Sequence, residues 1–224
     1  MYDKNFDVSR ENMVNNQIIT NKVNNPLLID ALLYIEKEKF IPKPYLAITY
    51  SDCEIPFNPE RSLMKTFIFA KILQYSDIKE NDSVLTIGCL TGYSVAIISK
   101  LAGYVFGLED NKDYVKQANK LLGEIACHNS SVNYGNLENG LKKNRPFDKI
   151  LIEGAVENIP EEIISQLKEG GKVFSVFKKK ESLVGSFKVG LKNNGLISYR
   201  HLFDANAKTL KAFVLKENGY DFKS

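Results

Sequence analysis

The stretch SVLTIGCLTGYSVAIISKLAGYVFGLE, residues 83–109, decides the fold that we expect. A short apolar run is followed by glycines on both sides of Cys89-Leu90-Thr91, a helical pattern, a second apolar run and the carboxylate of Glu109. A strand, a tight loop, a helix, a second strand and an acid, in this order, form the first βαβ unit of a nucleoside-binding sheet. The stretch therefore predicts a parallel sheet with a ligand site at the ends of its strands.

The loop after the first strand has the properties of a nucleoside site. Gly88 and Gly92 can take positive φ and leave room for a ligand against the backbone, and the helix that follows offers free N–H groups. Glu109 follows Gly88 by the roughly 20 residues expected of an acid that accepts hydrogen bonds from both ribose hydroxyls of an adenosine. The alternative is a crossover of purely structural role, in which Glu109 is only solvated.

Strand and helix patterns alternate in the rest of the chain. Apolar runs predict strands at 84–87, 104–108, 132–135, 147–153 and 172–177, with helices between them at 92–101, 111–126 and 159–168. This order predicts a doubly wound, mostly parallel α/β sheet. The segments at 186–200 and 209–217 have no helix between them, and the first contains the turn signal Asn193-Asn194-Gly195, so both suit antiparallel strands at one edge.

The N-terminal part predicts two helices and an irregular segment. Ser9 is the expected cap of the first helix, and Asn25-Pro26 opens a second one with an apolar stripe. Four prolines between Ile41 and Pro59 favour an extended segment that wraps over another element.

The composition is that of an ordinary soluble protein. The 224 residues are 44% hydrophobic and 25% charged, which is enough to bury one full core. A net charge of +3, from 30 basic and 27 acidic residues, is too balanced to favour nucleic acid or a membrane as the main partner. Without an apolar leader or a run of eighteen apolar residues, a cytoplasmic location is the expectation.

Cysteine and histidine are too few and too scattered to predict a metal site. Cys53, Cys89 and Cys127 are widely spaced, and His128 and His201 are the only histidines. We expect reduced thiols and no metal. Cys127-His128 could be imagined as a nucleophile and its base, but adjacent residues rarely present both side chains to one substrate, so a helix end is the preferred interpretation.

Four segments carry motifs of one enzyme family. Residues 84–93 read VLTIGCLTGY, residues 39–42 read KFIP, residues 147–160 read FDKILIEGAVENIP, and residues 200–213 read RHLFDANAKTLKAF. From about Arg10 to Phe213 the chain resembles the protein-L-isoaspartate O-methyltransferases, in particular their shorter bacterial members. The first three segments are similar to the family motifs V-L-(E/D)-I-G-x-G-(S/T)-G-Y, R-x-x-F-(V/I)-P and F-D-x-I-(I/V)-x-x-A.

The resemblance implies a Rossmann-like, seven-stranded class I fold with S-adenosylmethionine as methyl donor. In the family, the α-carboxylate of an isoaspartyl residue in a damaged peptide or protein receives the methyl group, giving a methyl ester and S-adenosylhomocysteine. A carboxylate is ionised at neutral pH and needs no strong base, so alignment and the exclusion of water supply most of the rate. The resemblance further implies N-terminal helices and a substrate-side loop at 1–60, and the methyltransferase unit at 61–224.

The resemblance also implies which residues hold the cofactor. They are Gly88, Thr91 and Gly92 of the first loop, Glu109 at the ribose, and Asn136 at the adenine. Asn136 stands where the family has the acid of a G-D pair, and its amide oxygen can still accept the hydrogen bond from the adenine amino group.

Other positions depart from the family motifs more strongly. Met64 stands at the serine of T-I-S-Q-P, whose hydroxyl lies close to substrate and cofactor, and a thioether donates no hydrogen bond. Ser62 falls on the threonine two positions earlier and is the remaining candidate for the catalytic hydroxyl. Leu90 replaces the second glycine of the first motif, which is expected to put a side chain beside the cofactor. Thr86 replaces the acid near the methionine end of the cofactor.

These departures leave three hypotheses. The first is an isoaspartyl-type methyltransferase that still binds S-adenosylmethionine. The second is a methyltransferase-fold protein that has lost its chemistry and serves as a binding or scaffolding partner. The third is a methyltransferase with a different acceptor, in which Leu63-Met64 reshapes the acceptor pocket. The sequence predicts no oligomeric state.

Overall fold

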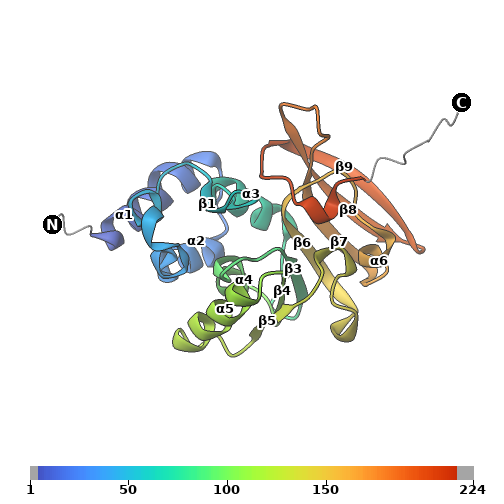
Figure 1. Cartoon of the computed structure of the whole chain (residues 1–224), viewed down its shortest axis with the longest axis horizontal. Helices are drawn as coiled ribbons and strands as arrows, with labels where there is room; N and C mark the ends of the chain where they lie inside the picture. The colour runs from blue at the N-terminus through green and yellow to red at the C-terminus, as the bar shows by residue number, and fades with distance from the viewer. Residues whose placement is uncertain (1–4, 216–224) are drawn as a thin grey trace, which may run out of the picture.

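Seven strands form the central sheet of the computed structural model, which describes residues 5–215 (Figure 1). Their order across the sheet is β5 (Ser130–Tyr134), β4 (Tyr104–Glu109), β3 (Ser83–Ile87), β6 (Phe147–Val156), β7 (Leu167–Phe177), β8 (Gly185–Asn193) and β9 (Leu196–Ala205). The strands from β5 to β7 are paired in parallel, and β7, β8 and β9 are paired antiparallel. The prediction of a doubly wound, mostly parallel seven-stranded sheet is therefore confirmed.

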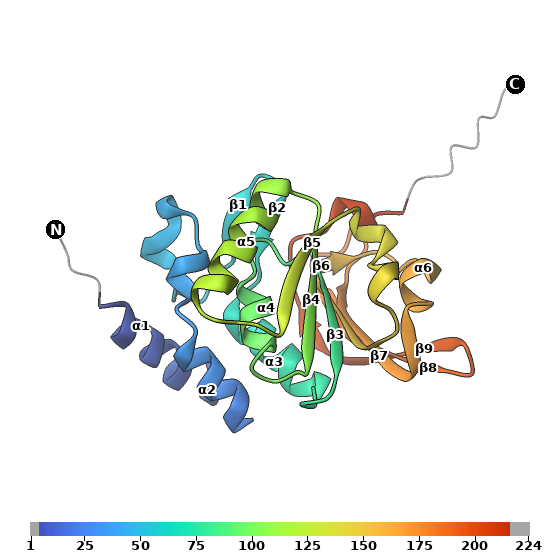
Figure 2. The ribbon, with the colours of Figure 1, turned by 90° about the horizontal axis from the view of Figure 1, so that it is seen from below.

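Each face of the sheet carries its own apolar core. Along β3, side chains alternate, so that Val84 lies in the larger core while Leu85 and Ile87 lie in the smaller one. The larger core contains residues of α3 (Thr66–Ser76), α4 (Tyr93–Ile98) and α5 (Lys112–Glu124), and the smaller one contains residues of α6 (Glu161–Ile164). Figure 2 shows α3, α4 and α5 on one side of the strands and α6 on the other. Because both faces are covered at the centre of the sheet, β3, β4 and β6 are rich in apolar residues, whereas the edge strand β5 is only partly buried.

The N-terminal helices begin at caps that are only partly those predicted. Asn5, not Ser9, caps α1 (Phe6–Met13), because the Asn5 side chain accepts a hydrogen bond from the Val8 N–H at 3.2 Å. The helix continues as a π-helical turn, η1 (Val14–Ile18), and a 3-10 turn, η2 (Ile19–Asn21). The opening of α2 (Pro26–Tyr34) by Asn25 and Pro26 is confirmed. No helix between residues 5 and 215 is long and apolar enough to cross a membrane.

The segment predicted to be irregular contains short elements only. Two 3-10 turns, η3 (Lys37–Phe40) and η4 (Lys43–Ile48), precede the hairpin of β1 (Ile55–Asn58) and β2 (Arg61–Leu63). Further 3-10 turns, η5 (Leu137–Asn139) and η6 (Lys142–Asn144), lie between β5 and β6. The hairpin pairs residues on both sides of position 60, and the larger core contains both Met13 and Val84. The division of the chain at residues 60 and 61 stays a prediction.

Two predicted elements in the second half are wrong in extent. The helix predicted at 159–168 is the single turn α6, because β7 begins at Leu167 and pairs with β6. The strand predicted at 209–217 is absent from the described part of that segment. Thr209 makes only an isolated parallel bridge to Ala155, and the 3-10 turn η7 (Lys211–Phe213) follows, while residues 216 and 217 lie outside the described residues. The antiparallel strands are β8 and β9, joined at the predicted Asn193-Asn194-Gly195 turn.

Candidate functional site

The carboxyl ends of β3, β4 and β6 meet at one edge of the sheet. The chain runs from β3 outward to β4 and β5, then returns to β6 on the other side of β3, which makes this edge the topological switch point. Ligands of doubly wound sheets bind in the crevice outside such a point. Gly88 follows β3, Glu109 ends β4, Glu153 lies near the end of β6, and Arg61 reaches this edge from β2.

The loop after β3 keeps the backbone of a glycine-rich turn. Gly88 and Gly92 have φ of 82° and 90°, and Leu90, at the second glycine of the motif, has φ of 50°. Such a left-handed conformation costs a non-glycine residue roughly 1–2 kcal/mol. The Leu90 N–H donates to Glu109 Oε2 at 2.8 Å, which fixes the turn against β4. The Leu90 side chain is buried in the larger core, so the turn keeps its left-handed conformation with a leucine at the glycine position.

Arg61 and Glu109 form a buried two-point ion pair. Arg61 Nη1 donates to Glu109 Oε1 at 3.1 Å, and Nη2 donates to Oε2 at 2.9 Å. The same guanidinium donates to the Gly88 carbonyl at 3.0 Å and to Asp110 Oδ1 at 2.9 Å. The Glu109 side chain is 0% exposed and that of Arg61 is 11% exposed. Bidentate guanidinium–carboxylate contacts of this kind are among the strong hydrogen bonds of proteins.

Burial and the hydrogen-bond donors around Glu109 act on its pKa in opposite directions. Burial raises the pKa of Glu109, and the Arg61 charge opposes that rise. The carboxylate also accepts hydrogen bonds from the backbone N–H groups of Leu90, Asp110 and Asn111, at 2.8, 3.1 and 3.2 Å. Several N–H donors favour an ionised carboxylate. Arg61 and these N–H groups therefore favour the ionised carboxylate, against the burial that raises its pKa.

Glu153 supplies a carboxylate beside Thr86, where the resemblance implies that an acid has been lost. Thr86 pairs with Leu151 of β6, and Glu153 lies two residues further along, on the same face. The hydroxyls of Thr86 and Ser94 both donate to Glu153 Oε1. Burial raises the pKa of Glu153 to about 7, while the two hydroxyl donors act in the opposite direction. The acid missing from β3 thus has a titratable counterpart on β6.

Replacing Glu153 by glutamine is expected to remove one source of pH dependence. Because the pKa of Glu153 is raised in the folded protein to about 7, its contribution to stability is fully present below pH 4.5 and is lost as the pH rises through 7. Relative to Glu153→Gln, the wild type should therefore lose about 1.4 kcal/mol of unfolding free energy per pH unit between these values. Urea unfolding at pH 5, 6 and 7 measures it. Glu161→Gln, at an exposed position of α6, is the control, and parallel curves for wild type and Glu153→Gln would contradict the expectation.

Two of the predicted cofactor residues lie together. Gly88 and Glu109 are both contacted by the Arg61 guanidinium. Asn136 is exposed beyond the end of β5 and precedes η5.

The remaining predicted loop residues have structural contacts. The Thr91 hydroxyl donates to the Phe40 carbonyl at 2.6 Å, which ties the KFIP segment to the loop after β3. A side chain at Gly92 would lie 3.1 Å from the Cβ of Ala118, so this glycine lets α5 pack closely on the start of α4. Thr91 and Gly92 thus fix the turn through contacts with Phe40 and α5.

Ser62 and Met64 are not brought to the Glu109 carboxylate. Ser62 is half-buried on β2 between the buried Arg61 and Leu63, so side-chain alternation points it to the opposite face of the strand. Met64 is buried in the larger core. A catalytic role of Ser62 stays a prediction.

Arg61, Leu210 and Glu153 are absent from the sequence-based site. Arg61 is 48 residues from Glu109 in the chain, and nothing in its local sequence indicates the contact. Leu210 lies against Gly154 and Gly88, at 2.5 and 3.5 Å from the position of an added Cβ. Glu153 could have been found as a lone acid at the end of an apolar strand, the same signal that identified Glu109.

The cofactor that the resemblance implies, S-adenosylmethionine, does not fit the site in this conformation. A side chain at Gly88 would meet Arg61 Nη2 at 3.2 Å and Leu210 at 3.5 Å, so these two residues fill the space that the glycine leaves open. The adjoining cavity has a volume of about 230 Å³, below the roughly 300–1,000 Å³ of typical small-molecule sites. Its lining is Asn58, Glu60, Arg61, Asp110, Asn111, Tyr114, Leu137, Leu210, Lys211 and Ala212. The donors and acceptors suit an adenosyl ligand, but Arg61 and Leu210 occupy the space at Gly88 that the ligand would need.

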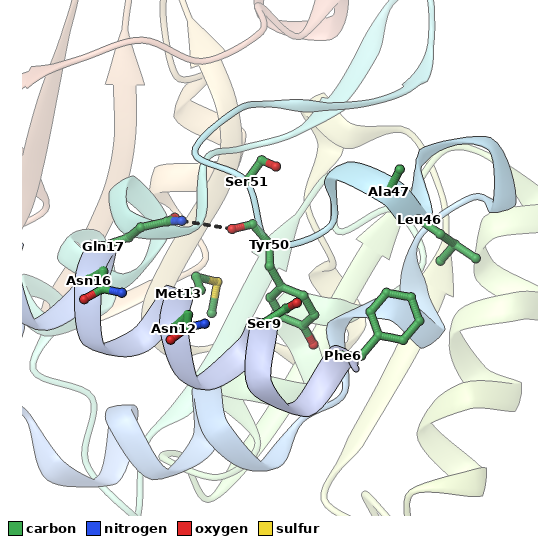
Figure 3. A pocket seen from close by; sticks show the side chains of 10 residues that line it. All are labelled: Phe6, Ser9, Asn12, Met13, Asn16, Gln17, Leu46, Ala47, Tyr50 and Ser51. Atoms are coloured by element: carbon green, nitrogen blue, oxygen red, sulfur yellow. Dashed lines mark hydrogen bonds between the residues drawn. The ribbon is translucent and has the colours of Figure 1, made fainter. Parts of the chain in front are cut away.

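A second cavity, of about 290 Å³, lies at the N-terminal helices (Figure 3). One wall is formed by α1 and η1, the other by residues 46–51, and Gln17 Nε2 donates to the Tyr50 carbonyl at 2.9 Å across it. Its lining carries amides, hydroxyls and apolar groups but no charged side chain. It therefore lacks a carboxylate for a ribose, and the nucleoside site is better placed at Glu109. Within residues 5–215 no cluster of histidine, cysteine and acidic side chains could hold a metal ion.

The sequence matches one protein family over most of its length. The family described as Protein-L-isoaspartate(D-aspartate) O-methyltransferase matches residues 8–205. Protein-L-isoaspartate O-methyltransferase 2 of Shewanella sediminis (strain HAW-EB3) is 29% identical over 165 residues, 74% of this chain and 68% of that protein. Protein-L-isoaspartate O-methyltransferase of Syntrophus aciditrophicus (strain SB) is 30% identical over 168 residues, 75% of this chain and 77% of that protein.

Solved structures share the fold. A protein-L-isoaspartate O-methyltransferase superposes with a TM-score of 0.80 at 21% identity, over 92% of this chain and 67% of its own. A Plasmodium falciparum protein in complex with S-adenosyl-L-homocysteine superposes with a TM-score of 0.75 at 20% identity, over 93% of this chain and 99% of its own. The fold of these proteins therefore extends over nearly the whole chain.

Proposed function

The chain belongs to the protein-L-isoaspartate O-methyltransferase family, and on that premise we propose that it is an S-adenosylmethionine-dependent methyltransferase acting on isoaspartyl carboxylates in proteins. The observation that carries the proposal is the family match over residues 8–205, which includes the hairpin, the loop after β3 and Glu109. Peptides or proteins with isoaspartyl residues are the proposed partners. A cytoplasmic location is part of the proposal, and the three unpaired cysteines, Cys53, Cys89 and Cys127, support it.

The proposed chemistry makes few demands on the protein. The accepting carboxylate is ionised at neutral pH, so no side chain has to remove a proton from it. S-adenosylmethionine, when bound, supplies the methyl group. The work of the chain is to hold the ribose hydroxyls at Glu109, to align the peptide and to exclude water. We propose Gly88, Thr91, Gly92, Glu109 and Asn136 for the cofactor, and the Ser62 hydroxyl for the peptide.

Methyl transfer from labelled S-adenosylmethionine tests the proposal. A base-labile methyl ester is expected on an isoaspartyl peptide and not on the same peptide with normal aspartate. Ser62→Ala should lower kcat/KM roughly threefold to tenfold, which corresponds to one hydrogen bond of about 0.5–1.5 kcal/mol. Thr20→Ala, at an exposed hydroxyl on η2, is the control. Equal rates for Ser62→Ala and the wild type would contradict the role of Ser62.

A second candidate function is favoured by two observations. Arg61 occupies both oxygens of Glu109, and Met64 puts a buried thioether where the family carries a hydroxyl. Both observations suit a protein that keeps the fold and binds a peptide but transfers no methyl group. If an isoaspartyl peptide binds in calorimetry but receives no labelled methyl group, this second candidate replaces the first.

A further inference from the structure

We propose that Arg61 occupies the ribose subsite of this protein, and that an adenosyl ligand binds by displacing the guanidinium from Glu109. The proposal rests on the proposed function, because it takes the ligand to be an adenosine derivative. Displacement of Arg61 also explains why a site with suitable chemistry has no room for the ligand in this conformation.

The hydrogen bonds of Glu109 show that ribose and Arg61 exclude each other. A carboxylate offers about four lone-pair positions. Glu109 already accepts two hydrogen bonds from Arg61 and three from backbone N–H groups. Both oxygens are engaged by the guanidinium, and these are the acceptors that two ribose hydroxyls would need. A ribose therefore reaches Glu109 only after Arg61 has left.

The position of the guanidinium over Gly88 leads to the same conclusion. Nη2 lies 3.0 Å from the Gly88 carbonyl and 3.2 Å from where a Cβ of Gly88 would be. The missing side chain of this glycine is what lets a ligand approach the backbone. Arg61 thus fills the glycine's open face as well as the hydrogen-bonding site.

Arg61 has a place to go when it is displaced. It lies on β2, a three-residue strand that pairs only with β1 and is not part of the main sheet. Asp110, with a side chain 46% exposed, already accepts from Nη1 and lines the adjoining cavity. After release from Glu109, the guanidinium can stay paired with Asp110. After the exchange, Asp110 is the counter-ion of Arg61, and the ribose hydroxyls donate to Glu109 in place of the guanidinium.

Arg61→Gln is the direct test, because it shortens the side chain and removes the charge. Calorimetry with S-adenosylhomocysteine should give a Kd at least about tenfold lower for Arg61→Gln than for the wild type, because the ligand no longer competes with an ion pair. Arg200→Gln, at an exposed arginine of β9, should leave the Kd unchanged. The gain should be seen with adenosine and be lost with 2′,3′-dideoxyadenosine, which has no hydroxyls to offer Glu109.

The outcomes separate this inference from the proposed function. Equal and measurable affinity of wild type and Arg61→Gln for S-adenosylhomocysteine overturns the inference and leaves the function standing. No binding to either protein overturns both. An equal gain with adenosine and its dideoxy form overturns the assignment to the ribose subsite.

A measurement on the wild type covers the case in which Arg61→Gln does not fold. Phenylglyoxal modifies accessible arginines, and peptide mass spectrometry reads each site separately. Saturating S-adenosylhomocysteine should increase modification of Arg61 several-fold, while the exposed Arg145 and Arg200 stay constant as internal controls. Binding that leaves Arg61 as protected as before contradicts the displacement.

Discussion

Replacing Glu109 by alanine is expected to lower the free energy of unfolding by about 3–5 kcal/mol at pH 7, because it leaves a buried guanidinium without its main counter-ion. The Arg61 side chain is 11% exposed, and within residues 5–215 Asp110 is then its one remaining carboxylate partner. The Asp110 side chain is 46% exposed, so solvent screens this contact. Glu109→Ala also frees the backbone N–H groups that cap onto the carboxylate. Urea unfolding followed by circular dichroism measures the loss.

Asp110→Ala is the matched control for this prediction. It removes the exposed partner of the same guanidinium and should cost about 0–1 kcal/mol. The double variant Arg61→Met with Glu109→Ala should be more stable than Glu109→Ala alone, because replacing a buried pair by apolar groups is often nearly neutral. If Glu109→Ala is no more destabilising than Asp110→Ala, Glu109 is not the main counter-ion of Arg61.

The sheet could be predicted because its information is local. The central parallel strands bury both faces, so runs such as Val84 to Ile87 and Ile150 to Ile152 are mostly apolar within a few residues. The turn at Asn193-Asn194-Gly195 and the helix start at Asn25-Pro26 are likewise predicted by two or three adjacent residues. The extent of an element that depends on a distant partner does not follow from its local sequence. The helix at 159–168 is cut short because residues from Leu167 pair with β6, which no local pattern indicates.

The residues of the first βαβ unit at the site could be predicted, but the side chains that contact them from other strands could not. Gly88 and Glu109 follow from spacing within one βαβ unit. Arg61 is separated from Glu109 by 48 residues and Glu153 from Thr86 by 67. The first contact depends on where β2 lies relative to β4, and the second on the pairing of β6 with β3. Because Glu153 lies beside Thr86, the threonine at the acid position of the motif does not leave this part of the sheet without a carboxylate. A sequence motif records a missing acid, while the structure has a carboxylate at the same point of the sheet from the neighbouring strand.

Replacing Lys37 by methionine is expected to change how stability depends on pH. Lys37 is 1% exposed, and its ammonium donates to the Thr49 carbonyl at 2.8 Å and to the Thr66 hydroxyl at 2.7 Å. Among residues 5–215 no carboxylate lies within ion-pair distance of its Nζ, and burial lowers the pKa of Lys37 to about 7. Above this pKa, Lys37 is a buried neutral amine with two hydrogen bonds.

The sign of the effect follows from proton binding. Between about pH 7 and the usual lysine pKa near 10.4, the unfolded chain binds one proton more at this site than the folded protein does. The stability contributed by the neutral amine is therefore present above about pH 10 and is lost as the pH falls through 7.

Relative to Lys37→Met, the wild type should gain about 1.4 kcal/mol of unfolding free energy for each pH unit from 7 to 9. Urea unfolding at pH 7, 8 and 9 gives the slope. Lys39→Met, at the exposed lysine two residues away, should run parallel to the wild type. If Lys37→Met also runs parallel to it, then Lys37 is protonated in the folded protein and must have a counter-ion at neutral pH.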